Sequence, residues 1–526
     1  MFLFGYHNGH DRDTHVASWM EASRQFRQMI WFPRWAAEAN YGFGEPRFVF
    51  YPPLSWMLGG VLGLFLSWTS VPAVFVWLTF TVAGAAMWKC AREWLPPPEA
   101  AIAAVLYAVN PYAMVTAYTR CAYGELLACA FFPLLVRGTL RIGTGGRQAI
   151  GPLAVALAAI WLADFPAGVV ATYSLVFLLL IQYIFFRSWR TVLFGATSIL
   201  LGLGMDAFIL LPAAWETKWV QINAVIIRDY LPWHNFLFAK DNVPPMIEFN
   251  QKISILAVFL GCVTVIAMSL THKLRDKHLA VWSSLSALGT LSICMMFPLS
   301  LPLWRYLPAL QFVQFPWRWL FPLALAGSLL TAALVTQLRG WLAREWLAWV
   351  AIALALVAID GGILRTKEWT TRTITDLDRA MRSGEGYQGL PEYAPIASRP
   401  SKLWKTSPSV VAFGRQKNAP WKLHVDLWSV KRKLISVDSP EPFYLDLKLL
   451  AYPSWRAKIN ERDSSIGTNP DTGQIRLCVP KGFTRIDVFW ARTCDVITGN
   501  VISLLAVIVM VCLSIVSPRV DGRTNH

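Results

Sequence analysis

The chain has 526 residues, of which 55% are hydrophobic and only 15% are charged, and it contains 26 Trp and 30 Phe. This composition is too apolar for a water-soluble protein of this length, so the sequence predicts an integral membrane protein. Cytoplasmic Lys and Arg residues that set membrane topology account for much of the net charge of +16, so the charge requires no nucleic-acid partner.

The first 53 residues are polar and aromatic, and we expect them to form an outer loop with interfacial helices (domain 1-53). Residues 18–31 have apolar side chains on one side of a helix, which predicts an amphipathic helix on the membrane surface. These side chains are Trp19, Ala22, Phe26, Met29 and Ile30. The opening Met1-Phe2-Leu3-Phe4 resembles the end of a helix rather than a signal peptide, so we expect a membrane span upstream of it.

A multi-span helical core is predicted for residues 54-364, and a last transmembrane helix with a cytoplasmic tail for 496-526. Apolar stretches of roughly 17 to 23 residues can cross a ~30 Å hydrocarbon layer as helices. We predict eleven of them, at 71-90, 99-117, 121-137, 149-164, 168-186, 190-212, 253-271, 278-297, 318-338, 345-364 and 496-516. Residues 54–70 are apolar but Gly-rich, and we expect a half-inserted helix or a short span there.

Basic residues indicate the orientation of these spans. If the N-terminal segment lies outside, the inner connections contain fourteen Lys or Arg residues against five acidic ones. The N-terminal stretch 1–52 contains five Arg and five acidic residues, so it has no basic excess. Because cytoplasmic loops carry the excess of Lys and Arg, we expect the N-terminal segment to lie on the outer side.

Residues 365-495 have a different pattern, which predicts an outer-face, sandwich-like antiparallel β domain. Residues 421–428, 443–448 and 484–490 alternate between apolar and polar side chains, as expected of half-buried strands. Turn signals such as Asn469-Pro-Asp-Thr-Gly473 separate them. From this pattern we expect a compact domain, after which the chain returns to the membrane through the last span.

Eight Cys residues are scattered along the chain without metal-binding spacing. Most lie in or beside predicted spans, where a buried thiol behaves as a small hydrophobic group. Cys478 and Cys494 both fall on the outer side and could form a disulfide, although a hairpin between them does not obviously place them opposite each other.

The most concentrated polar cluster is the run from Gly9 to His15, which contains His10, Asp11 and Asp13. Two carboxylates and two imidazoles this close together can abstract protons or hold a divalent metal. In a helix, Asp11 and His15 are four residues apart on one face, which makes them the candidate metal ligands. The alternative is a solvated loop that ends in a helix cap, because Asp and Thr commonly occupy cap positions.

Charged residues also occur where apolar ones are expected, and such residues usually pair or line a wet cavity. Arg120 and Glu125 flank a connection between two predicted spans, where they form either a structural ion pair or a ligand contact. Arg318 has a planar donor fork that can receive a phosphate, or it is an interfacial Arg beside a belt of Trp residues. Asp206 is the only acid well inside a predicted span.

A bacterial membrane-protein family described as 6-pyruvoyl-tetrahydropterin synthase-related has a first outer loop that resembles several runs of this chain. They are Gly9-His10-Asp11 with His15, Phe32-Pro33-Arg34-Trp35, Tyr41-Gly42-Phe43-Gly44 and Phe50-Tyr51-Pro52-Pro53-Leu54. Further similarities are Arg120 with Glu125, the run Gln314-Phe315-Pro316-Trp317-Arg318, and Glu392-Tyr393 with Pro395. Ala451-Tyr-Pro-Ser-Trp455 and Gly482 resemble the β domain of this family and of its YfhO-type relatives.

The resemblance does not imply pterin chemistry, since nothing in the chain resembles the three-histidine zinc site of the soluble synthase. It implies kinship with the GT-C class of membrane glycosyltransferases, whose active site lies at the outer membrane face. These enzymes commonly use a polyprenyl-phosphate sugar and an acidic residue of the first outer loop. Family members begin with a span before the His-Asp motif, and this chain departs from that pattern. The implied location is the bacterial inner (cytoplasmic) membrane, with the β domain on the periplasmic or extracellular side.

We therefore expect a glycosyltransferase that moves a sugar from a polyprenyl-phosphate donor to an envelope glycan or lipid acceptor. Asp11 is the expected base and Asp13 the second choice, while His10 and His15 orient Asp11 or help bind a metal. Arg120 or Arg318 receives the phosphate, and the other expected substrate contacts are Glu125, Gln314, Arg34, Tyr51, Glu392 and Tyr393. The alternatives are a non-catalytic scaffold or transport factor for envelope polysaccharide, and a transporter with a mid-membrane site.

Overall fold

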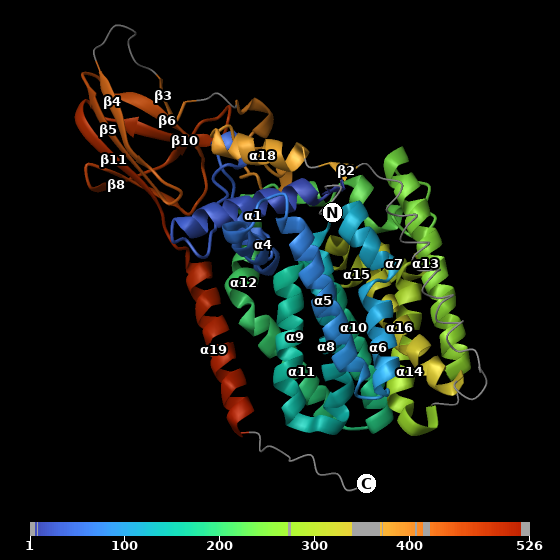
Figure 1. The fold of residues 1–526 in the computed structure, drawn as a ribbon. Coiled ribbons are helices and arrows are strands. Elements are labelled where there is room, and N and C mark those ends of the chain that lie inside the picture. Colours follow the sequence, from blue (N-terminus) through green and yellow to red (C-terminus); the bar gives the residue numbers. More distant parts are fainter. Residues whose placement is uncertain are drawn as a thin grey trace.

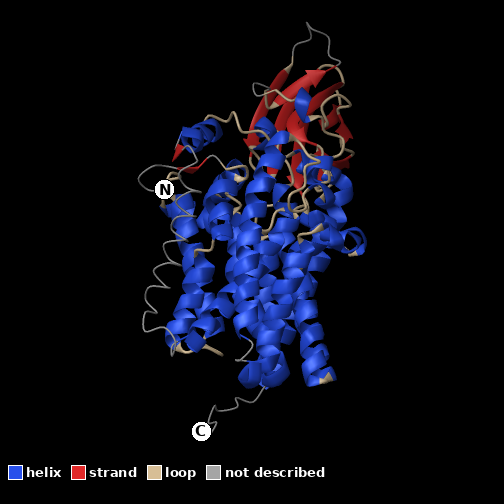
Figure 2. Ribbon diagram, turned by 90° about the vertical axis from the view of Figure 1, so that its right-hand side faces the viewer, coloured by secondary structure: helices blue, strands red, loops and turns tan. Residues whose placement is uncertain are grey.

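A bundle of long helices has a β domain at one of its ends in the computed structural model (Figures 1 and 2). The structure describes residues 6–7, 9–271, 275–338, 369–370, 372–404, 408–413 and 421–516. Nine helices within these ranges are long and apolar enough to cross a membrane. The predicted fold class, a polytopic helical membrane protein with a C-terminal antiparallel β domain, is confirmed.

Nine of the predicted spans correspond to candidate membrane-crossing helices. These are Val71–Ala91 (α5), Pro97–Arg120 (α6 Pro97–Ala108, α7 Pro111–Met114 and η1 Val115–Arg120), Tyr123–Gly143 (in α8 Tyr123–Gly145), Gly146–Ala163 (ending with α9 Ile150–Ala163), Phe165–Phe186 (α10), Pro244–Leu270 (α13), His278–Met295 (in α14 Arg275–Met295), Pro316–Val335 (η10 Pro316–Trp319, then α16 Leu320–Leu338) and Cys494–Leu513 (in α19 Cys494–Val516). The predicted span 345-364 lies outside the described residues.

The predicted span at 190-212 is a broken one, because the two helices there are long and apolar enough to cross a membrane only when taken together. Two helices, α11 (Trp189–Met205) and α12 (Ala207–Glu216), meet there at an angle of 71°. Asp206 lies between them, and its carbonyl accepts the first backbone hydrogen bonds of α12, from Ile209 and Leu210 at 3.0 and 2.9 Å.

Helix α1 (Arg12–Arg27) differs from the amphipathic helix expected at residues 18–31. It starts earlier, ends where Met29 takes a left-handed φ of 61°, and buries 12 of its 16 residues. It lies across the end of the bundle (Figure 1), beside α4 (Pro53–Phe65) and near α18 (Arg372–Arg382). The 13 residues of α4 span about 20 Å, too short to cross the layer, as a half-inserted helix would be.

The β domain contains two antiparallel sheets, with strand orders β3-β6-β10-β9 and β4-β5-β11-β7-β8. The strands are Val410–Phe413 (β3), Lys422–Trp428 (β4), Arg432–Ser439 (β5), Phe443–Leu450 (β6), Trp455–Ile459 (β7), Arg462–Ser464 (β8), Gly467–Thr468 (β9), Gln474–Val479 (β10) and Gly482–Trp490 (β11). Apolar side chains from both sheets, such as Ile435 and Leu477, share one core. Cys478 and Cys494 are free thiols, so the disulfide that they could form is absent. Cys478 pairs with Tyr444 in the sheet, whereas Cys494 begins α19.

The N-terminal loop packs against this C-terminal domain. Trp35, Phe43, Val49 and Phe50 belong to the same hydrophobic core as the β strands. A two-stranded sheet also pairs β1 (Tyr6–His7) with β2 (Trp369–Thr370). These long-range contacts hold the beginning of the chain at the end of the bundle where the β domain lies.

Basic connections gather at the other end of the bundle. The carboxylate of Glu93, between α5 and α6, forms ion pairs with Arg137 and Arg141 of α8. Figure 1 shows the connection between α5 and α6 at the end of the bundle away from the β domain. The bundle therefore has one basic end and one end covered by the N-terminal loop and the sandwich.

Candidate functional site

The chain approaches the helical bundle very closely just before α1. A Cβ atom on Gly9 would lie 2.5 Å from Sγ of Cys121 and 2.9 Å from the carbonyl carbon of Arg120. Only glycine fits this contact, and the Asp11 N–H then donates a hydrogen bond to the Arg120 carbonyl at 3.0 Å. This contact fixes the His-Asp motif beside Arg120.

The position of Arg120 follows from an interruption of its helix. Pro111 follows the end of α6, and the Asn110 side chain caps the next turn by accepting the N–H of Ala113 at 3.0 Å. The chain continues as a π-helical turn that ends at Arg120, and Cys121 then takes a left-handed φ of 56°. Such π-helical turns occur frequently at functional sites.

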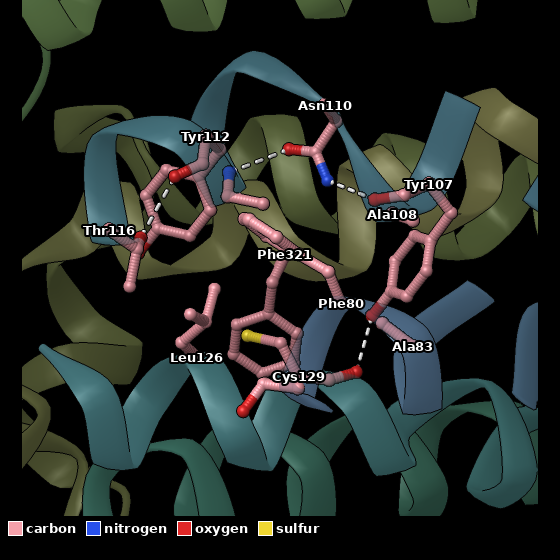
Figure 3. A pocket seen from close by; sticks show the side chains of 12 residues that line it. Phe80, Ala83, Tyr107, Ala108, Asn110, Tyr112, Thr116, Leu126, Cys129 and Phe321 are labelled. Atoms are coloured by element: carbon pink, nitrogen blue, oxygen red, sulfur yellow. Dashed lines mark hydrogen bonds between the residues drawn. The ribbon is translucent and has the colours of Figure 1, made fainter. Parts of the chain in front are cut away.

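A small cavity of about 20 Å³ lies beside this interruption. Figure 3 shows Tyr107, Asn110, Tyr112 and Thr116 around it, with Asn110 also donating to the Tyr107 carbonyl at 2.6 Å. A cavity of this size admits about one water molecule. It can ease the packing of the irregular turn, but it is too small to hold a substrate.

Arg120, Glu125 and Arg318 form a buried charge network. Oε2 of Glu125 lies 2.8 Å from Nη1 of Arg120 and 3.1 Å from Nε of Arg318. The three residues are 7%, 1% and 8% exposed, respectively. The structure thus contains the ion pair between Arg120 and Glu125, which was one of the two alternatives from the sequence. It adds a second guanidinium, that of Arg318, which is 193 residues away in the sequence.

Neighbouring groups hold the network in place. The Tyr112 hydroxyl donates to the other carboxylate oxygen of Glu125, and Arg318 Nη1 donates to the Val313 carbonyl at 2.8 Å. The Arg120 guanidinium lies over the ring of Trp317, 4.7 Å from its centroid. Tyr112 was not identified as a site residue from the sequence. The only sequence feature that marks it is its position directly after the helix-breaking Asn110-Pro111 pair.

His10 and Asp11 form a hydrogen-bonded pair at the protein surface. Nδ1 of His10 lies 2.6 Å from Oδ1 of Asp11, and the two side chains are 79% and 35% exposed. The hydrogen bond to Asp11 raises the pKa of His10. Burial alone would raise the pKa of Asp11, but the hydrogen bond with His10 and the charge of Arg120 outweigh burial and lower it to about 2. Asp11 is therefore ionised, and His10 must donate from Nδ1.

His15 lies on the buried side of the same helical turn. It is 4% exposed, and its Nδ1 is hydrogen-bonded to the Tyr51 hydroxyl at 3.1 Å. Burial lowers the pKa of His15 to about 4, so its ring is neutral at pH 7. A Cβ atom on Gly124 would lie 3.5 Å from the His15 ring and 3.6 Å from a carboxylate oxygen of Asp164, so both groups face the same position on α8.

Residues that follow the helical core in the sequence pack beside Tyr51. Tyr393 stacks on Phe50, with centroids 5.6 Å apart, and its edge faces the ring of Tyr51. Burial raises the pKa of Glu392, and the negative charges of Glu45 and Asp11 act in the same direction. The structure thus brings Glu392 and Tyr393 to the His-Asp motif from more than three hundred residues away.

Three of the expected site residues point elsewhere. Asp13 is 61% exposed and pairs with Arg12. Gln314 has a strained φ of 66°, and its amide donates to the Val225 carbonyl at 3.1 Å. Arg34 donates to the Phe208 carbonyl at 3.0 Å in a different part of the structure.

The comparison with protein families matches the helical core. A family model described as 6-pyruvoyl-tetrahydropterin synthase related domain, a membrane protein, covers residues 48–365, more than half of the chain. The chain belongs to this family. Searches of curated proteins and of solved structures each gave no match.

The matched region of this PTPS-related protein includes Tyr51 and the network of Arg120, Glu125 and Arg318. It does not include the His-Asp motif or the β domain. The family therefore covers the helical half of the candidate site, while the other half consists of segments on either side of the matched region.

The candidate metal ligands, Asp11 and His15, do not form a metal site. Among the residues that the structure describes, no group of three or more His, Cys, Asp or Glu side chains is arranged to hold a metal ion. Asp11 binds His10 and His15 binds Tyr51, so the expected pair of ligands is engaged by two different partners.

Four cavities among the described residues are lined by other parts of the chain. Asp11, Arg120 and Arg318 line none of these four. The His10 and Asp11 side chains are partly open to solvent, whereas the charge network is buried. Its two guanidinium groups lie over the rings of Trp317 and Phe315, which stack 4.7 Å apart.

Proposed function

We propose that this PTPS-related membrane protein is a glycosyltransferase of the GT-C type, which transfers a sugar from a polyprenyl-phosphate donor to an envelope glycan or lipid acceptor. The observation that carries the proposal is an ionised, partly exposed carboxylate, Asp11, with an imidazole partner and beside the buried Arg120, which shares Glu125 with a second buried guanidinium, Arg318. An acid–base pair next to a phosphate-binding charge is the arrangement that glycosyl transfer from a phosphate requires.

In this proposal the site faces the periplasm or the cell exterior. The basic connections with Arg137 and Arg141 lie at the opposite end of the bundle, and basic connections of membrane proteins face the cytoplasm. The site and the β domain then share the outer face of a bacterial inner membrane, where a polyprenyl-linked sugar is within reach from the lipid.

His10 and Asp11 act together as the proton acceptor. A carboxylate with a pKa of about 2 is a weak base near neutral pH, because a general base works best with a pKa near the working pH. Asp11 therefore orients His10 by accepting the Nδ1 proton, and the Nε2 lone pair of His10 takes the proton of the acceptor hydroxyl. This reverses the roles expected from the sequence, in which Asp11 was the base.

The transfer step is a displacement at the anomeric carbon of the sugar. The acceptor oxygen forms a bond to this carbon while the bond from the carbon to the phosphate oxygen breaks, and polyprenyl phosphate leaves with the electron pair. Arg318 and Arg120 stabilise the negative charge that grows on the leaving phosphate. This requires that the side chains which bury the two guanidinium groups move aside.

The direct test is incubation of the purified full chain with a panel of polyprenyl-phosphate sugars and measurement of the polyprenyl phosphate released. The Asp11→Asn variant should lose roughly 10²- to 10⁴-fold in rate, the range typical of acid–base catalysis. Asp13→Asn is the matched control, since its carboxylate is exposed and pairs with Arg12, and it should retain the wild-type rate. Full activity of Asp11→Asn, or release that depends on Asp13 instead, would defeat the assignment.

The same assay separates this proposal from a non-catalytic role in envelope polysaccharide assembly. A scaffold or transport factor binds its ligand but releases no polyprenyl phosphate with any donor, with or without added divalent metal. Failure of the whole panel in protein of normal stability would therefore favour the scaffold.

A further inference from the structure

A second cavity, of about 250 Å³, lies where the N-terminal loop, α12, the β domain and α19 meet. Gln25 of α1 contributes to its wall, ten residues after His15 and thus about 15 Å farther along the helix axis. The cavity is therefore separate from the His-Asp site. One water needs about 10–15 Å³ in such a cavity, so this space admits a group of many atoms.

Hydrogen bonds between four parts of the chain fix the walls. The Trp490 N–H donates to the Lys431 carbonyl at 2.9 Å, which holds the last strand against the turn between β4 and β5. Arg34 Nη2 donates to the Phe208 carbonyl at 3.0 Å, and the Phe208 N–H donates to Ser503 Oγ of α19 at 2.9 Å. The cavity is a built feature of the junction between the domain and the membrane helices.

Buried polar atoms in the lining have no protein partner. Within the described residues, Arg34 Nη1, Gln25 Oε1 and Thr493 Oγ1 are buried and make no hydrogen bond. An unsatisfied buried polar group costs roughly 1–3 kcal/mol, and more when it is charged. Most buried polar groups in proteins are satisfied. Arg34 Nη1 and Thr493 Oγ1 can donate to an anionic ligand in the cavity, whereas Gln25 Oε1 can only accept a hydrogen bond.

Positive charge dominates the lining. Arg34, Lys431 and Arg492 contribute three cations, while Glu216 is the acid in the wall. Glu216 accepts a hydrogen bond from Tyr452. Asp495, outside the lining, is a second acid whose charge acts on Arg34, so two acids stand against the three cations.

The lining also contains apolar side chains. Phe208 and Val496 are two of them. Helix α19, which contains Val496, is a peripheral helix (Figure 1) with exposed apolar side chains, including Ile497 and Val501, both 52% exposed. The cavity thus combines cationic and apolar side chains at the beginning of a candidate membrane span, as a lipid headgroup site would.

We propose that this cavity binds the phosphate headgroup of an anionic membrane lipid, with the guanidinium of Arg34 as its main ligand and the acyl chains along α19. A phosphate satisfies the free Arg34 donor and the Thr493 hydroxyl, and it neutralises the cationic lining. The bound lipid connects the β domain, the N-terminal loop and the last helix. It stabilises their arrangement whether or not the His-Asp site is catalytic.

The test uses the full chain purified in detergent, with lipid binding followed by native mass spectrometry and by the shift in Tm. Three probes are compared: phosphatidylglycerol, a diacylglycerol with the same acyl chains, and inorganic phosphate. We expect phosphatidylglycerol alone to bind and to raise Tm, because only this probe contains both the charge and the chains. An equal effect of inorganic phosphate would identify a free-anion site, and an equal effect of diacylglycerol an apolar site, and either result overturns the proposal.

Variants locate the binding. Arg34→Gln should weaken phosphatidylglycerol binding roughly 10- to 100-fold, the effect of one lost hydrogen bond between charged groups. The double variant Lys431→Gln with Arg492→Gln alters only exposed side chains, so it provides a test if Arg34→Gln folds poorly. Arg485→Gln, an exposed position on β11 outside the cavity lining, is the matched control and should bind as the wild type does. Wild-type affinity in both cavity variants would refute the site, and no transferase activity enters this readout.

Discussion

Replacing Glu125 with Gln removes the one carboxylate that two buried arginines share. Its Oε2 atom lies 2.8 Å from Arg120 and 3.1 Å from Arg318, and it is only 1% exposed. Gln has nearly the same shape and keeps an acceptor for the Tyr112 hydroxyl, so the packing is retained. The perturbation is therefore electrostatic, since two like charges remain close together in a buried environment without their counter-ion.

The expected loss follows from the burial of the pairs. Breaking a buried ion pair by removing one partner costs roughly 3–5 kcal/mol, and the two pairs do not add because they share one carboxylate. We therefore expect Glu125→Gln to lower the free energy of unfolding by about 3–5 kcal/mol. A variant with both Glu125→Gln and Arg318→Gln should lose less than the sum of the single variants, because it leaves one unpaired cation instead of two.

The chain contains a matched control at the other end of the bundle. Glu93 also faces two arginines, Arg137 and Arg141, but these three side chains are 26%, 17% and 45% exposed. Solvent screens such pairs, so Glu93→Gln should cost about 1 kcal/mol or less. Both variants are compared by titrating the purified proteins with SDS and following Trp fluorescence. If Glu125→Gln costs no more than Glu93→Gln, the buried network does not stabilise the fold as argued here.

Three further predictions depend on titration. Asp11→Asn removes the hydrogen bond that raises the pKa of His10, so the acid limb of the pH–rate profile should move to lower pH in the residual activity; an unmoved limb would exclude His10 as the proton acceptor. His15 has a pKa of about 4 when folded and 6.5 when unfolded, so the unfolded chain takes up the proton first and stability is lost as pH falls from about 6.5 to 4. Between pH 7 and pH 5, unfolding titrations should show the wild type losing about 2 kcal/mol more stability than His15→Gln loses. Parallel pH dependences of the two proteins would contradict this. Burial raises the pKa of Glu21 to about 7 from 4.5, so the folded chain holds this proton more tightly and stability is lost as pH rises from about 4.5 to 7. Glu21→Gln should therefore gain about 3 kcal/mol at pH 8 and little at pH 5, whereas the exposed Glu385→Gln should gain nothing at either pH.

The sequence by itself determined the membrane architecture, because the bilayer imposes a local rule. A helix in lipid needs an uninterrupted apolar stretch that satisfies its own backbone, and nine such stretches became candidate spans close to their expected bounds. Strand alternation predicted the β domain for the same reason, since a half-buried strand shows its two faces in consecutive residues. The apolar pattern did not reveal the bend at Asp206, where a buried polar residue interrupts an otherwise apolar stretch and the chain turns by 71°.

The candidate site was predictable only where its contacts are short in sequence. Arg120 and Glu125 are five residues apart on one connection, and their ion pair was among the expected alternatives. Arg318 reaches the same carboxylate across 193 residues, and nothing in the local sequence indicates that it does. The same holds for Arg34, which resembled a site residue by motif but lies in the wall of a different cavity.

Only the tertiary structure decided which polar groups of the first loop can act together. Neighbouring side chains on a helix point in different directions, so Asp13 faces solvent while His15 is buried against Tyr51. The contact of Gly9 with Cys121, which places Asp11 beside Arg120, depends on the packing of the loop against the end of the bundle. Sequence patterns specify which residues enter the membrane, but the direction and distance of each charge are set by packing between segments that are far apart in the chain.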